Sequence, residues 1–89
     1  MGNGVTLSER DSGILEFEGS WWLYPGPKDR AIREYLGISA TRYYQAIRRL
    51  IDDPVADTTH PLVVRRLRHM RDERISQIAA RLSGGDSAG

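Results

Sequence analysis

Residues 31–50 read AIREYLGISATRYYQAIRRL, two short amphipathic segments that meet at Gly37. Apolar residues recur three and four positions apart in each segment, and this spacing puts them on one helical face. A glycine after the last apolar residue can take the left-handed conformation that ends a helix, and Ser39 can cap the next helix. The pattern predicts two helices joined by a tight turn, with inward faces formed by Ala31, Ile32, Tyr35 and Leu36 and by Tyr43, Ile47 and Leu50.

The opposite face of the second helix carries residue types that read DNA. A 3.6-residue period assigns to this outward face Thr41, Arg42, Tyr44, Gln45, Arg48 and Arg49. Arginine can bind guanine edges with two hydrogen bonds, glutamine can pair with adenine, and further arginines can hold phosphates. No acidic residue falls between Arg42 and Leu50. We interpret the segment as a DNA-binding helix-turn-helix; the alternative is an ordinary helical hairpin with a solvated arginine face.

The composition suits one small domain, with 89 residues and 39% hydrophobic content. The net charge is only +1, but residues 1–26 carry one basic against four acidic residues, and residues 27–89 carry twelve basic against eight acidic ones. Twelve of the thirteen basic residues are arginine, whose fork-shaped guanidinium favours a phosphate or carboxylate partner. A genome rich in G and C would produce the same bias.

Neither a membrane-spanning segment nor a secretion signal is visible in the chain. No apolar run approaches the roughly 20 residues that a bilayer requires, and no signal-peptide pattern precedes the fold. We therefore expect a cytoplasmic protein with no membrane contact.

Towards the N-terminus, residues 1–5 are expected to form a flexible tail. A first helix begins at Ser8 or two residues earlier, and Ser8 starts a capping-box pattern. The apolar stripe of this helix runs on to Trp21 and Trp22, of which we expect Trp22 to be the more exposed. Residues 24–27, Tyr-Pro-Gly-Pro, end the first helix and lead into the second.

Towards the C-terminus, Pro54 is expected to stop the helix that ends near Leu50. Residues 57–60 then form a polar loop, and a last helix runs from Pro61 to about Leu82. Residues 83–89 read SGGDSAG, which indicates a flexible polar tail.

The last helix carries more apolar surface than so small a domain needs. Its first half can pack on the domain through Leu62, Val63, Val64, Leu67 and Met70. Its second half continues the stripe with Ile75, Ile78, Ala79 and Leu82. An isolated apolar stripe is poorly stabilised in water, so this patch should fold back onto Trp21 or pair with a second copy of the chain.

None of the residue groups that catalysis or metal binding requires is present. The chain has no cysteine, His60 and His69 are nine positions apart without metal-ligand spacing, and the neighbours Asp52 and Asp53 lack a third ligand. A phosphate-cradling glycine loop and a nucleophile elbow are also missing. We expect no enzyme activity, no metal and no cofactor.

Several short sequence motifs together cover nearly the whole folded part of the chain, from about Leu7 to Leu82. They are L-x-x-R-D-x-x-I-L-x-F-E, W-W, a P-G-x-K turn, A-I-R and S-A-T-R-Y-Y-Q, carried by Leu7, Arg10, Asp11, Ile14, Leu15, Phe17, Glu18, Trp21, Trp22, Gly26, Lys28, Ala31, Ile32, Arg33 and residues 39–45. In this order they resemble the actinobacterial family catalogued as domain of unknown function 3263, which occurs in mycobacteria and their phages. The resemblance implies a helix-turn-helix-like fold without an established activity. More loosely, residues 27–50 resemble the promoter-binding region of bacterial sigma factors and response-regulator domains.

These patterns together predict an all-α fold, a small four-helix domain at residues 6–82 with a helix-turn-helix and a long C-terminal helix. We expect a transcriptional regulator that binds double-stranded DNA. We expect contacts with base edges from Thr41, Arg42, Gln45 and Arg49. We expect contacts with the DNA backbone from Lys28, Arg30, Tyr44, Arg48, Arg65 and Arg66. A lone unit contacts few base pairs, so it should act as a homodimer through the C-terminal helix or beside another protein.

The alternative interpretation is a protein-binding adaptor or a phage-type inhibitor that acts on RNA polymerase, a sigma factor or another host protein. It is based on the acidic first helix, whose Glu9, Glu16 and Glu18 would repel DNA but suit a basic protein surface. The sequence leaves this alternative open.

Overall fold

The structure, a computed structural model, describes the backbone of residues 6–88 and the side chains of residues 6–82. Within that range the chain is all-α, as predicted, and contains no strand. Its elements are α1 (Glu9–Glu18), η1 (Trp21–Leu23), α2 (Lys28–Ala31), η2 (Ile32–Leu36), α3 (Ala40–Leu50), α4 (Pro54–Thr59) and α5 (Pro61–Ala88). The tail predicted at residues 1–5 lies outside the described residues.

Helix α1 is capped as predicted but ends earlier than expected. The Ser8 hydroxyl oxygen accepts a hydrogen bond of 3.0 Å from the backbone N–H of Asp11, which satisfies a free amide of the first turn. The helix ends at Glu18 because Gly19 follows, where a helix is less favourable. Helix α5 approaches closely at this point: a Cβ on Gly19 would lie 3.0 Å from a methyl carbon of Val63.

The two tryptophans lie in η1, a turn of 3-10 helix, and not in α1 as the apolar pattern predicts. Trp21 packs against the core, whereas Trp22 is 52% exposed, so the expected difference between them is confirmed. Their rings meet edge to face with centroids 6.2 Å apart. The break after Glu18 lets the chain turn before the tryptophans instead of carrying them along the α1 axis.

The turn that leads into α3 has the predicted conformation. Gly37 has a φ of +71°, in the left-handed region where a residue with a Cβ is strained. The Ser39 hydroxyl oxygen accepts from the backbone N–H of Arg42 over 3.2 Å and caps α3. Tyr35 is an exception to the predicted inward face, since it is half exposed and its ring lies 4.5 Å from that of Tyr24, centroid to centroid. The π-helical turn η2 takes this part of the chain out of the α-helical register, which rotates Tyr35 outward.

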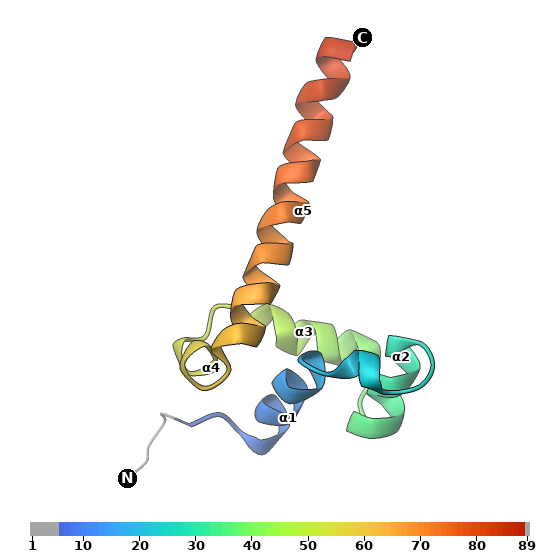
Figure 1. Cartoon of the computed structure of the whole chain (residues 1–89), viewed down its shortest axis with the longest axis vertical. Coiled ribbons are helices and arrows are strands. Elements are labelled where there is room, and N and C mark those ends of the chain that lie inside the picture. Colours follow the sequence, from blue (N-terminus) through green and yellow to red (C-terminus); the bar gives the residue numbers. More distant parts are fainter. Residues whose placement is uncertain (1–5, 89) are drawn as a thin grey trace.

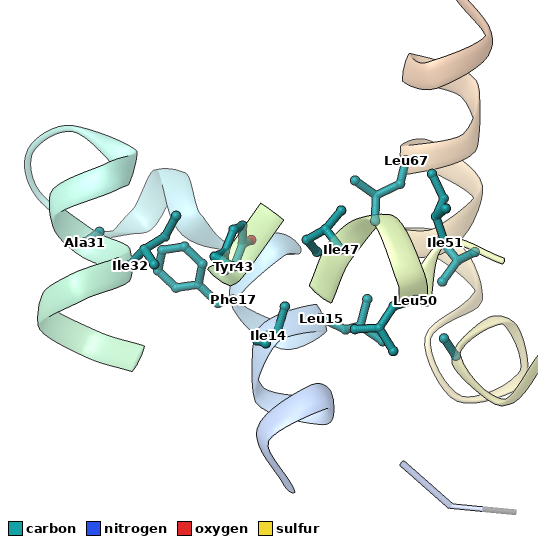
Figure 2. Packing of buried hydrophobic residues seen from close by; sticks show 12 residues of the cluster. Ile14, Leu15, Phe17, Ala31, Ile32, Tyr43, Ile47, Leu50, Ile51 and Leu67 are labelled. Atoms are coloured by element: carbon teal, nitrogen blue, oxygen red, sulfur yellow. The ribbon is translucent and has the colours of Figure 1, made fainter. Parts of the chain in front are cut away.

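The core lies between α1, the α2–η2 segment and α3, and it extends to the first turns of α5 (Figure 2). Phe17 meets the ring of Tyr43 edge to face with centroids 5.8 Å apart, and Figure 2 shows Ile32 beside this pair. The predicted inward face of α3 is confirmed, because Tyr43, Ile47 and Leu50 are all buried. The remaining buried apolar residues are Ile14, Leu15, Ala31, Ile51, Ala56, Val64 and Leu67.

Helix α4 occupies residues where the sequence predicts a loop, so the described chain has five α-helices rather than four. The Asp53 carboxylate accepts from the backbone N–H of Val55 over 2.8 Å and caps the helix. Pro54 sits in the first turn, where its missing N–H leaves no intrahelical bond unmade. The prediction is wrong because it treats Pro54 only as a stop, although an Asp-Pro pair also suits a helix start. Ala56 is buried, and α4 packs on α5.

Helix α5 packs on the domain through its first turns and then projects away from it (Figure 1). This projection gives the molecule extents of 57 × 34 × 20 Å. Val64 and Leu67 are buried, as predicted, whereas Leu62 and Met70 are exposed and do not pack on the domain as the sequence suggests.

The second half of α5 contradicts the idea that the helix folds back onto Trp21. Residues 69–82 are all exposed, so the apolar stripe predicted there has no cover within the described chain. The helix also continues through residues 83–88 instead of ending near Leu82. Within the described range, α5 and the other helices are too short or too polar to cross a membrane.

Candidate nucleic-acid interface

Helix α3 separates buried from exposed side chains as its period predicts. The outward face consists of six exposed residues, Thr41, Arg42, Tyr44, Gln45, Arg48 and Arg49. It therefore brings together the four predicted base-reading residues and two of the six predicted backbone-binding residues. The face contains three arginines and no carboxylate.

A buried carboxylate fixes how α3 lies on the domain. Glu18 is the only charged residue that is buried among the described side chains. It accepts a hydrogen bond from the Tyr43 hydroxyl of α3 and pairs with the Lys28 ammonium of α2, 2.9 Å from carboxylate oxygen to nitrogen. Burial, followed by the hydrogen bond to Glu18, raises the pKa of Tyr43 far above its ordinary range, so the hydroxyl remains a donor. These three residues join α1, α2 and α3.

Lys28, a predicted phosphate contact, has several partners within the domain. Besides its ion pair with Glu18, its ammonium lies 5.2 Å from the ring centroid of Trp21, 5.6 Å from that of Tyr43 and 5.4 Å from that of Tyr44. Cations are attracted to aromatic faces at such distances. The sequence does not reveal this pairing, because Glu18 stands among the acidic residues expected on the surface of the first helix.

Arg49 is also held within the chain. Its guanidinium donates to both carboxylate oxygens of Asp11, over 3.1 and 2.9 Å, in the fork geometry that arginine favours. The hydrogen bond to Asp11 raises the pKa of Arg49, which stays charged in any case. Arg49 thus leans from α3 towards the start of α1, at the margin of the outward face.

Arg42 and Arg48 differ from Arg49 because neither forms an ion pair with any side chain of residues 6–82. Arg42 lies with Gln45 and Arg10 around a cleft between α1 and α3. Arg48 lies with Tyr44 in a groove between α3 and α5. The outward face is thus flanked by two hollows, and each is lined in part by arginines that form no ion pair with the side chains of residues 6–82.

The three remaining predicted backbone contacts come from other elements. Arg30 on α2 and Arg65 on α5 are exposed. The Arg66 guanidinium lies 5.0 Å from the ring centroid of Trp22 and donates to the backbone carbonyl of Glu18 over 3.3 Å. Arg66 is therefore tied to η1 and the end of α1, whereas Arg30 and Arg65 form no ion pair with any side chain of residues 6–82.

Among the described residues, no group of three or more histidine, cysteine, aspartate or glutamate side chains is placed to hold an ion. The chemistry that the α3 face offers is hydrogen-bond donation and positive charge, from arginine, glutamine and threonine side chains.

The comparison with known families matches the resemblance seen in the sequence. The family described as protein of unknown function (DUF3263) matches residues 6–78, which span α1 to α4 and more than half of α5. No curated protein and no solved structure matches the chain. Because the match extends over most of its length, the chain belongs to the DUF3263 family.

Proposed function

We propose that this protein binds double-stranded DNA and regulates transcription, with the segment α2–η2–turn–α3 acting as a helix-turn-helix and α3 entering the major groove. The observation that carries the proposal is the outward face of α3. It combines exposed Thr41, Gln45 and Tyr44 with Arg42 and Arg48, two arginines without an internal ion pair in the described chain. Such a face matches the donor and acceptor pattern of base edges and the charge of phosphates.

The candidate base readers differ in how readily they reach DNA. Thr41, Arg42 and Gln45 are exposed, so they are available without any rearrangement. Arg49 must first exchange the Asp11 carboxylate for a base edge. We therefore assign the sequence-specific contacts first to Arg42 and Gln45, and give Arg49 a marginal position.

The candidate phosphate contacts divide in the same way. Arg48, Arg30 and Arg65 are exposed, and Tyr44 can donate its hydroxyl to sugar or phosphate. Lys28 and Arg66 would each have to leave an internal partner, Glu18 or Trp22. The backbone contacts that contribute most are thus expected from Arg48 and Arg30.

The test is a selection of binding sites from a pool of random duplexes of about 20 base pairs, long enough for a dimer on two half-sites. Arg42→Ala and Gln45→Ala are then compared with the matched control Arg81→Ala, which removes a charge at the far end of α5. The proposal expects the two α3 variants to lose about tenfold or more on the selected duplex. They should lose less on a scrambled one. Equal losses on both duplexes would remove these residues as base readers, and failure to enrich any sequence would contradict specific recognition.

A further inference from the structure

The part of α5 that projects from the domain carries an apolar stripe with no intramolecular cover. Ile75 is 58% exposed, Ile78 49% and Leu82 70%. Their spacing of three and four residues places them on one helical face. Large apolar side chains grouped on an exposed helix commonly mark an interaction surface.

This stripe continues a face that is already used for packing. Val64 and Leu67, which are buried on the domain, lie on the same side of α5 at the same three- and four-residue spacing. Where the helix leaves the domain, the face opens into the groove between α3 and α5, lined by Ile47, Tyr44 and Met70 among others. A partner lying along α5 would meet apolar side chains from this groove to Leu82, interrupted on the same face by Arg71, which pairs with Asp52.

One border of the stripe carries two arginines. Arg74 and Arg81 each precede a stripe residue by one position, and neither pairs with a side chain of residues 6–82. The acidic neighbours are already engaged. Asp52 and Asp72 both contact Arg71, over 3.1 and 3.6 Å, and Glu73 lies 3.8 Å from His69. Arg74 and Arg81 are therefore the two cations of this segment that contact no carboxylate among the described side chains.

We propose that this surface, formed by Met70, Arg74, Ile75, Ile78, Arg81 and Leu82, binds an acidic amphipathic helix of another protein. Leucine-like side chains at spacings of three and four would cover the stripe, and flanking carboxylates would pair with Arg74 and Arg81. Met70 and Leu82 are twelve positions apart, so the surface is about 18 Å long and suits a helix of about four turns.

A second copy of the chain fits this surface less well. Two α5 helices could pack antiparallel with Ile75 opposite Leu82 of the copy. Arg74 would then lie beside Arg81 of the copy, because in an antiparallel pair the residues on one flank of the seam face the residues on the equivalent flank of the partner helix. A parallel pair would bring Arg71, which follows the same face, against its own counterpart. Like charges in these positions are destabilising. Duplex DNA offers the stripe no apolar surface to bury.

The proposal goes beyond DNA binding, and its main measurement uses a peptide and contains no DNA. The probe is a fluorescein-labelled helical peptide of about 18 residues with leucines at the spacing of the stripe and glutamates on both flanks. A matched peptide carries lysine in place of each glutamate. Fluorescence anisotropy with the full chain should show binding of the glutamate peptide below about 100 µM and none of the lysine peptide.

Variants locate the site. The double variant Arg74→Glu with Arg81→Glu, and separately Ile78→Ser, should each weaken binding of the glutamate peptide by about tenfold or more. Arg33→Glu, an exposed charge reversal on η2, is the control and should leave peptide binding unchanged. Since Ile78 lies outside the core, circular dichroism should report the same helix content in all variants.

Four outcomes would overturn the proposal. They are absence of binding of the glutamate peptide, equal binding of both peptides, and displacement of the bound peptide by duplex DNA. The fourth is self-association of the chain in sedimentation at the same concentrations, abolished by Ile78→Ser, which would make a second copy the occupant. Apart from displacement by duplex DNA, none of these results depends on whether α3 binds DNA.

Discussion

The Tyr43 hydroxyl of α3 donates a hydrogen bond to the Glu18 carboxylate of α1, at a site where both residues are buried. The ammonium group of Lys28, on α2, forms an ion pair with the same carboxylate. A buried charge is tolerated only when it is paired and hydrogen-bonded, so this arrangement demands one orientation of the three helices. The outward face of α3 is thus positioned by a polar contact as well as by the apolar core.

Removal of the Tyr43 hydroxyl should destabilise the fold. Tyr43→Phe keeps the ring in the core but leaves Glu18 with one donor fewer, which is expected to lower the free energy of unfolding by about 1–3 kcal/mol. Urea denaturation of the two proteins measures the difference. Tyr44→Phe is the control, because Tyr44 is exposed and should change stability by less than about 0.5 kcal/mol. Similar small effects of both substitutions would mean that the Glu18 contact contributes little.

The same contact predicts a loss of stability at high pH. Burial and the hydrogen bond to Glu18 raise the pKa of Tyr43 in the folded chain above the 10.0 of an unperturbed tyrosine. Its contribution is therefore fully present below about pH 10 and is lost as the pH rises further, because the unfolded chain releases a proton that the folded chain keeps. The free energy of unfolding, measured from about pH 9 to about pH 11, should fall more steeply for the native chain than for Tyr43→Phe, by up to about 1.4 kcal/mol per pH unit. Parallel curves would contradict the shifted pKa.

Local sequence signals predicted the parts of the fold that depend on neighbours along the chain. The cap at Ser8, the left-handed Gly37, the cap at Ser39 and the buried face of α3 each follow from spacings of a few residues, and the structure contains all of them. The same local reasoning failed at Pro54, whose preceding aspartate starts α4. It also failed at Tyr35, because nothing in the apolar spacing announces a π-helical turn.

The sequence predicts which side chains form the candidate site, but not which of them form ion pairs with other residues of the chain. The period of α3 places six side chains outward, but it cannot show that Arg49 bonds Asp11, 38 positions away, or that Lys28 bonds Glu18, ten positions away. Such pairs depend on how the helices pack against each other. The DNA proposal therefore depends mainly on Arg42, Gln45 and Arg48.

Gly37 should be sensitive to substitution for conformational reasons alone. A Cβ at this position meets nothing within 4 Å, yet its φ of +71° is costly for a residue with a side chain. Gly37→Ala is expected to lower the free energy of unfolding by about 1–2 kcal/mol, and Gly37→Asn by less. Gly13→Ala is the matched comparison, since Gly13 lies inside α1 with open space around it, and it should stabilise the chain by about 0.5–1 kcal/mol. Thermal unfolding of the three variants would reject this explanation if Gly37→Ala matched Gly13→Ala.

Asp11 should restrain DNA binding by holding Arg49. Asp11→Asn removes a negative charge beside the α3 face and frees the guanidinium, so affinity for duplex DNA should rise about two- to fivefold at low salt. The gain should shrink when Arg49→Ala is present as well, which a double-mutant cycle on binding free energies measures. An equal gain in both backgrounds would show that Asp11 acts through its charge alone.

The most direct test of the DNA proposal is fluorescence anisotropy of a labelled random duplex, titrated with the full chain at several salt concentrations. Arg48, Arg30 and Arg65 are expected to neutralise several phosphates, so affinity should fall about tenfold or more between about 50 and 200 mM salt. Arg48→Ala should reduce the slope of log affinity against log salt by about 1, whereas Arg81→Ala should leave it unchanged. Absence of binding at about 50 mM salt, where even weak phosphate contacts are favoured, would contradict DNA binding by this chain.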